Sequence, residues 1–157
     1  MEWKGSITKT LMLFIAQSIF DPVGFTCPVS LFPKLLLQKL WKKHQIWHAP
    51  VENEMAKEFC KWVTHLPELS SIEIPRWIQA GPIEADHWSL HTFSDVSKKA
   101  YATVVFLRIV RNDDISIFLV SAKSRVAYLN KISIPRLKLL AATIGASLCQ
   151  SVKKTIS

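Results

Sequence analysis

The spacing of apolar residues predicts helices in the first part of the chain. Apolar positions recur at helical intervals over residues 8–19, about 29–41 and about 52–66. Pro33 lies inside the second stretch and predicts a kink there or a later start. Residues 21–24, Asp-Pro-Val-Gly, are typical of a turn. The third stretch carries one apolar stripe, formed by Met55, Phe59, Trp62, Val63 and Leu66.

In the second part of the chain the spacing of apolar residues changes from that of helices to the alternation of strands. Residues 87–93, 101–110 and 115–122 have the composition and alternation of strands, and residues 111–114 predict a hairpin turn between the last two. The proline-broken stretch 72–78 is compatible with a strand or a connector. A final helix is expected to begin at about Pro135. Proline is tolerated in the first turn of a helix, because its missing N–H would have no partner within the helix. Its apolar stripe contains Leu137, Leu140, Ala141, Ile144 and Leu148. The predicted fold class is therefore α/β, a helical region followed by a β-β-β-α unit.

Composition narrows the class of protein. Of the 157 residues, 49% are hydrophobic and 20% are charged, which is typical of a globular chain and argues against disordered and collagen-like classes. The longest apolar run, residues 11–16, is far shorter than the roughly 20 residues that span a bilayer, and no signal-type cleavage site follows it. Cys27, Cys60 and Cys149 form no C-x-x-C motif. We therefore expect reduced thiols, an intracellular protein and no membrane partner.

Positive charge gathers in the second half. The net charge is +8, and no acidic residue follows Asp114. Such asymmetry favours a polyanionic partner, although a basic solvated surface remains the alternative. Binding to nucleic acid is expected to be weak, sequence-independent and salt-sensitive. The candidate phosphate contacts are Lys123, Arg125, Lys131 and Arg136.

Several kinds of catalytic site are excluded by their missing motifs. His44 and His48 have the spacing of a zinc-protease helix, but Gln45 stands where the general-base Glu is needed. The chain contains no G-x-S-x-G, Walker or G-x-G-x-x-G sequence, and no D-[ST]-G from which an aspartic-protease dyad could be built. Asp95 remains, at the end of a predicted strand. A carboxylate on the first strand of a meander that leads into a helix is how ribonuclease H-like metal sites begin, although a strand-end Asp that caps a turn is the alternative.

Several long sequence words carry a resemblance to a known family. They are ITKTLMLFIAQSIFDPVGF and KLLLQKLW in the first region, LPELSSIEIPRWI in the middle, and HTFSDVSKKAYATVVFLR, AKSRVA and IPRLKLLAA in the last. Over nearly its whole length, the chain resembles the Pol polyprotein of Pao-type (BEL/Pao) LTR retrotransposons, in the segment also termed the retrotransposon peptidase. The resemblance implies a helical reverse-transcriptase thumb/connection-like region in residues 1–80. It implies the N-terminal half of a ribonuclease H-like domain in residues 81–157.

The resemblance also implies the site residues. Asp95 matches the first metal-binding carboxylate of the ribonuclease H-like domain, and Lys138 stands where the family has Glu. The family uses Mg²⁺ or Mn²⁺. At about 4 Å and an effective dielectric constant near 20, an ammonium and a divalent ion repel by about 8 kcal/mol. Asp95 alone is therefore expected to be insufficient for metal binding, and no cofactor is expected for this chain.

These features predict a fragment or degenerate copy of a Pol polyprotein, inactive on its own. The parent role that the resemblance implies is reverse transcription and degradation of the RNA strand in RNA/DNA hybrids. Two alternatives remain open: a domesticated nucleic-acid-binding module, and a ribonuclease H-like subunit whose missing carboxylates come from a partner. The expected partners are an RNA/DNA hybrid or other nucleic acid and the rest of a Pol polyprotein. The expected location is the cytoplasm, where the parent element forms a virus-like particle, or the nucleus.

Overall fold

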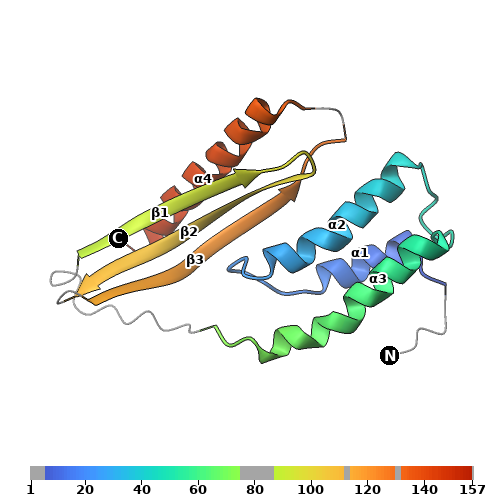
Figure 1. Ribbon diagram of the computed structural model, residues 1–157, viewed down its shortest axis with the longest axis horizontal. Coiled ribbons are helices and arrows are strands. Elements are labelled where there is room, and N and C mark those ends of the chain that lie inside the picture. The colour runs from blue at the N-terminus through green and yellow to red at the C-terminus, as the bar shows by residue number, and fades with distance from the viewer. Residues whose placement is uncertain (1–5, 75–86, 112–113, 130–131, 157) are drawn as a thin grey trace. The chain divides into compact units, whose positions relative to one another are not determined.

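The computed structural model describes residues 6–74, 87–111, 114–129 and 132–156 (Figure 1). In chain order the elements are α1 (Lys9–Gln17), α2 (Cys27–Lys42), α3 (Asn53–His65), the 3₁₀ helix η1 (Leu66–Ser71), β1 (His87–Val96), β2 (Ala100–Arg111), β3 (Asp114–Val126) and α4 (Ile134–Ile156). The predicted fold class is confirmed, because a helical region precedes a β-β-β-α unit of the ribonuclease H-like kind. Of the stretch 72–78, residues 75–78 lie outside the described residues.

The chain forms two compact units. Unit 1 comprises residues 1–20 and 29–76, and unit 2 comprises residues 21–28 and 77–157. The short segment 21–28 belongs to unit 2 because it lies along the outer edge of β3, where the Ala122 N–H donates to the Val23 carbonyl at 2.6 Å. Gly24 has a φ of +88°, and a Cβ at this position would lie 1.9 Å from the Ala122 carbonyl oxygen. Only glycine fits this close approach without strain.

Unit 1 is held together by side chains from its three α-helices. The predicted stripe on α3 is confirmed, with Met55, Phe59 and Trp62 buried. On α1 the buried face carries Met12 and Ala16 together with Lys9, whereas Phe14 is 71% exposed. The core cluster consists of Ile7, Met12, Leu36, Leu37, Leu40, Val51, Met55, Phe59 and Trp62.

Helix α2 begins at Cys27, ahead of Pro33, so the proline does not delay the start of the helix. The ring of Pro33 is buried in unit 1. A proline inside a helix deprives the carbonyl four residues earlier of its donor. Here that carbonyl accepts a hydrogen bond from a side chain of α3 instead, which explains why the helix continues through the proline.

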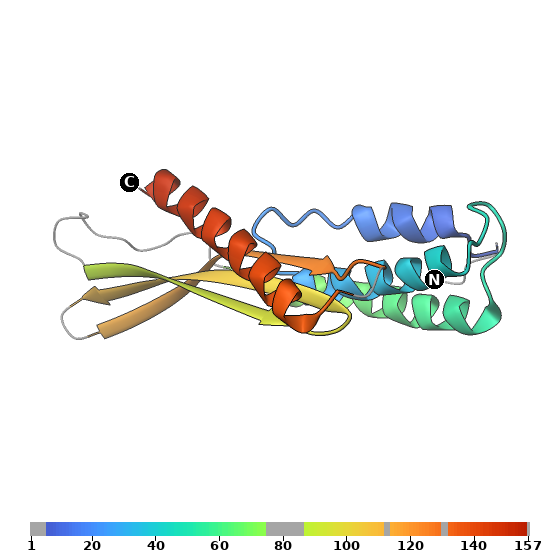
Figure 2. The same cartoon turned by 90° about the horizontal axis from the view of Figure 1, so that it is seen from above.

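Unit 2 is an antiparallel sheet in the order β1-β2-β3, with α4 lying at an angle across one face (Figure 2). Every second residue of β2 is buried beneath α4, as the period of a strand requires. A bulge interrupts the pairing of β2 with β3 between Val105 and Phe106. The predicted hairpin is confirmed by the pairing of Arg111 with Asp114, although residues 112–113 lie outside the described part. The α4 stripe is confirmed as well, with Leu137, Ala141 and Leu148 buried.

Two further observations concern membrane-spanning helices and disulfides. Among the described residues, no helix combines the length and apolar character needed to cross a bilayer. Cys27, Cys60 and Cys149 form no disulfide with one another in the structure.

Candidate carboxylate and phosphate-binding sites

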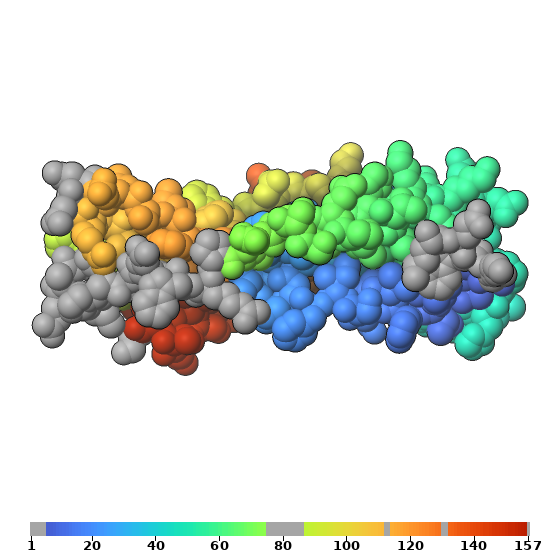
Figure 3. All heavy atoms as spheres, turned by 90° about the horizontal axis from the view of Figure 1, so that it is seen from below, coloured from blue at the N-terminus to red at the C-terminus, as the bar shows by residue number. Residues whose placement is uncertain are grey.

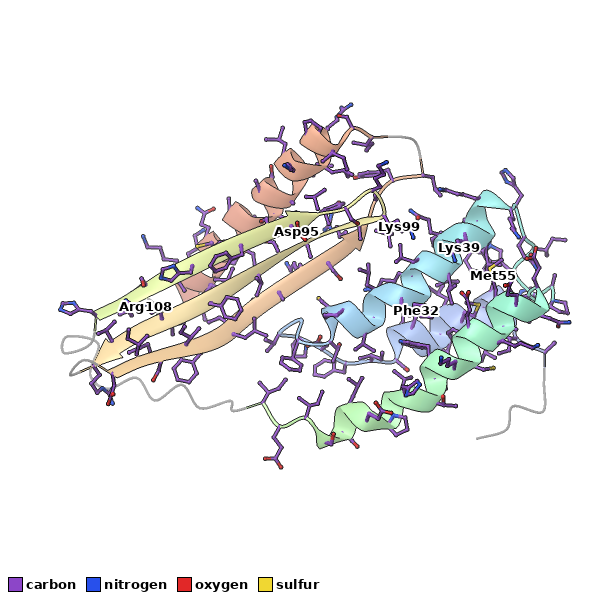
Figure 4. The ribbon with its side chains drawn as sticks, viewed as in Figure 1. Phe32, Lys39, Met55, Asp95, Lys99 and Arg108 are labelled. Atoms are coloured by element: carbon purple, nitrogen blue, oxygen red, sulfur yellow. The ribbon has the colours of Figure 1, made fainter. Side chains whose placement is uncertain are left out.

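Helix α4 packs against one set of β1 side chains, and Asp95 is not among them. The Ser94 hydroxyl lies 3.0 Å from the Thr103 hydroxyl and donates to the Ala141 carbonyl of α4 at 3.4 Å. Successive side chains of a strand point to opposite faces. Asp95, which pairs with Ala102, is therefore on the sheet face opposite α4, near the end of β1 (Figure 4). Its side chain is exposed to solvent.

Lys138 is the fifth residue of α4, and it too is exposed. It precedes Gly145 by two helical turns, so both residues lie on the same side of the helix. Gly145 packs against Thr103 of β2 and Ser94 and Thr92 of β1, so Lys138 lies on the side of α4 toward β1 and β2. Asp95 and Lys138 thus lie on opposite sides of β1, and within the described part of the chain no hydrogen bond or ion pair joins them.

The described acidic residues of unit 2 do not fit a two-metal site. They are Asp21, Asp95 and Asp114. Asp95 pairs with Ala102 and Asp114 with Arg111, so these two carboxylates are separated by about 30 Å of strand. A site that holds two ions about 4 Å apart needs several carboxylates together. Among the described residues, no group of three or more His, Cys, Asp or Glu side chains is placed to hold a metal ion.

Asp21 is committed to a structural role. Its Oδ1 accepts hydrogen bonds from the N–H groups of Gly24 and Phe25, and its Oδ2 accepts from the N–H and hydroxyl of Thr26, at 2.6–3.0 Å. Burial raises the pKa of this carboxyl and is the largest single influence. The four hydrogen bonds together outweigh it, so the pKa of Asp21 lies below its usual value of 3.8. This carboxylate fixes the turn that runs along β3.

Exposed cations gather at one end of unit 2, where β1 turns into β2 and β3 ends. Ala100 pairs with Val126, and the Ala127 N–H donates to the Lys99 carbonyl at 2.8 Å, so the β1–β2 turn adjoins the end of β3 (Figure 4). The first turn of α4 packs here as well, since Leu137 belongs to the same buried cluster as Tyr101 and Ala127. We call this group the cationic end; its members are Lys98, Lys99, Lys123, Arg125, Arg136 and Lys138.

Three of the four predicted phosphate contacts are part of this group. Lys123 and Arg125 pair with Thr103 and Tyr101, which puts them on the α4 side of β3, near Ala141 and Ile144 of the helix. Arg136 is in the first turn of α4. The fourth predicted contact, Lys131, lies outside the described residues. Figure 3 shows β3, in orange, at the surface of the molecule.

Lys98 and Lys99 were not predicted from the sequence as phosphate contacts. Their signal was a Lys-Lys pair in a turn, but only the pairing of β2 with β3 brings that turn next to Arg125. Within the described part of the chain, none of the six cations forms an ion pair. The N-terminus of α4 adds partial positive charge at the same place. The arrangement is suited to phosphate groups.

Comparison with known proteins identifies the family. The sequence model of one protein family, the Pao retrotransposon-like RNaseH-like domain, matches residues 8–157. No curated protein and no solved structure matches the chain. The matched range includes the helices of unit 1 as well as the β-β-β-α unit that carries Asp95 and the cationic end. The chain therefore belongs to the Pao retrotransposon family, as a ribonuclease H-like module.

Proposed function

We propose that this retrotransposon-derived module binds nucleic acid, with an RNA/DNA hybrid as its natural target, and does not cleave it unaided. The cationic end is the observation that carries the proposal. Its six side chains are exposed, and strand pairing brings the elements that carry them to one end of unit 2. Lys and Arg placed in this way neutralise backbone phosphates irrespective of sequence.

The expected binding is weak and strongly dependent on salt. Each phosphate that is neutralised releases condensed counterions, and the logarithm of the affinity falls with the logarithm of salt concentration by roughly 0.9 per contact. If most of the cationic end makes contact, the slope on a duplex is about −4 to −5. Lys123 and Arg125 should contribute two of these contacts, because they extend side by side from β3.

Lack of cleavage is supported by the place and surroundings of Asp95. Its carboxylate lies on the opposite face of the sheet from Lys138, which by the sequence resemblance stands at the position of a Glu. Asp114, the other described carboxylate on the strands, is at the opposite end of the sheet. Phosphodiester cleavage with two metal ions needs carboxylates that converge.

Binding can be tested by fluorescence anisotropy with the full chain and a labelled 20-base-pair RNA/DNA hybrid. Between about 50 and 200 mM KCl the affinity should fall by orders of magnitude. The double variant Lys123→Gln/Arg125→Gln should bind more weakly and with a slope reduced by about two. A matched control, Lys57→Gln/Lys61→Gln, removes two exposed lysines of α3 and should leave the affinity nearly unchanged. An affinity that is insensitive to salt would refute the proposal.

Cleavage is tested on the same hybrid with 5 to 10 mM Mg²⁺ or Mn²⁺, amounts chosen to saturate an ordinary hydrolytic site. The full chain should leave the RNA strand intact. Metal-dependent cleavage that disappears in Asp95→Asn would overturn this part of the proposal. Cleavage that requires both Asp95 and an added segment of a Pol polyprotein would instead identify a partner-dependent subunit.

A further inference from the structure

The sheet face opposite α4 displays large apolar side chains. Phe93 of β1 is 59% exposed and Ile117 of β3 is 65% exposed. We call this surface the open face; its apolar side chains are Phe93, Phe106, Ile115, Ile117 and Leu119, all on the same side of the sheet by strand register. Contiguous apolar surface of this kind marks an interaction site more often than isolated apolar residues do.

The open face is hollowed around a pair of aromatic rings. A hollow of about 420 Å³ is lined by His91, Phe93, Phe106, Arg108 and Ile117. The rings of Phe93 and Phe106 are 6.1 Å apart and inclined at 66°. Because their contact is edge-to-face and Phe93 is largely exposed, ring surface of Phe93 remains accessible to a flat ligand.

The two polar residues that line the hollow are Arg108, which is positively charged, and His91, whose ring nitrogens can form hydrogen bonds. Arg108 lies on β2 beside the hollow, and among the described residues it has no carboxylate partner (Figure 4). His91 Nε2 lies 2.9 Å from the Ser89 hydroxyl. The lining contains no carboxylate, and Asp95 is the next residue beyond Phe93 on this face. The hollow therefore combines an accessible aromatic ring with a guanidinium that has no carboxylate partner among the described residues.

We propose that the open face binds single-stranded nucleic acid, with an unpaired base stacked on Phe93 and a backbone phosphate on Arg108. Base–aromatic stacking is independent of sequence, because every base has a π face. Charge complementarity selects this occupant. An apolar peptide would cover the Arg108 guanidinium without a counter-charge, which is costly. A nucleic acid brings a phosphate to it.

This binding is distinct from that of the cationic end. Bases of an RNA/DNA hybrid are paired and stacked within the duplex, so they are not available to Phe93, whereas its phosphates are available to lysine and arginine. Unpaired bases adjoin the hybrid wherever a strand continues beyond it. The two surfaces would therefore recognise different parts of one substrate.

The test uses the full chain and a 12-nucleotide strand with one 2-aminopurine, whose emission changes when the base stacks on an aromatic ring. We expect binding to alter this emission. Phe93→Ala should weaken binding of the single strand by about tenfold. Phe93→Tyr keeps the ring and should retain binding. Ile115→Ala is the matched control, because Ile115 is equally exposed on the open face but lies outside the lining of the hollow.

The hybrid provides a second readout. Phe93→Ala should bind the blunt-ended hybrid as the parent protein does, and Lys123→Gln/Arg125→Gln should lose hybrid affinity. The proposal is overturned if Phe93→Ala binds the single strand normally, or if Ile115→Ala weakens binding equally. It is also overturned if the only effect of Phe93→Ala is dissociation of an oligomer in sedimentation, since the occupant would then be a second copy. If the parent protein binds the single strand but not the hybrid, the proposed function is rejected and this inference stands.

Discussion

The indole N–H of Trp62 donates a 3.0 Å hydrogen bond to the main-chain carbonyl of Val29. Val29 is four residues before Pro33 in α2, so its carbonyl is the one that the proline leaves without a backbone donor. Trp62 lies on α3 and is buried against Phe59, with their ring centroids 5.5 Å apart. A side chain of one helix thus completes the hydrogen bonding of another.

Trp62→Phe should destabilise the protein by about 1–3 kcal/mol, because the Val29 carbonyl loses its donor. Urea unfolding followed by circular dichroism measures this change. Pro33→Ala restores a backbone donor four residues after Val29, so the cost of Trp62→Phe should be smaller in that background. Equal costs in the two backgrounds would show that the hydrogen bond is not what Trp62 contributes.

Gly145→Ala should destabilise the protein, even though alanine is the better helix former by about 1 kcal/mol. A Cβ at Gly145 would lie 2.8 Å from the Thr103 hydroxyl, 3.0 Å from that of Ser94 and 3.1 Å from the Thr92 methyl group. Overpacking of this kind costs about 1–3 kcal/mol. The control is Ser147→Ala at an exposed site of the same helix, which should be neutral or slightly stabilising. A thermal midpoint raised by Gly145→Ala would contradict the close contact of α4 with the sheet.

Asp21→Asn should lower stability near neutral pH by about 1–3 kcal/mol, since the turn loses hydrogen bonds to a charged acceptor. The pKa of Asp21 is lower in the folded than in the unfolded chain, so its contribution is present above pH 4 and is lost as the pH falls through the folded pKa. The stability difference between parent and variant should therefore shrink below about pH 4. Urea unfolding between pH 3 and 7 checks this, with Glu73→Gln as an exposed control. A difference that is constant over this range would contradict it.

Lys9→Met should cost about 1–3 kcal/mol despite the similar length of the two side chains. Lys9 is only 3% exposed, its Nζ donates to the Gln45 carbonyl at 3.1 Å, and it lies 4.7 Å from the Trp47 ring centroid. Methionine leaves the carbonyl without this donor and removes the cation–π contact. The exposed Lys57→Met serves as the control and should change the free energy of unfolding by less than 0.5 kcal/mol. A neutral Lys9→Met would show that the ammonium does not stabilise unit 1.

The sequence pattern by itself determined the helices and strands of this protein. The stripe of Met55, Phe59 and Trp62 defined α3, and that of Leu137, Ala141 and Leu148 defined α4. The hairpin at residues 111–114 followed from its local composition. Each of these features depends on residues within a few positions of one another, and helical or strand period is a local property. The long words shared with Pao elements likewise carried the family.

Only the tertiary structure decided which residues share a surface. Asp95 lies on the sheet face away from α4, and the Lys99 carbonyl is hydrogen-bonded to the residue after β3. Gly24 lies close to the Ala122 carbonyl, and the Val29 carbonyl accepts a hydrogen bond from Trp62. These relations connect positions that are distant in sequence, and they depend on strand register and on which sheet face a helix covers. Such choices are made by long-range packing, because burying one face of the sheet under α4 leaves Phe93 and Arg108 on the other.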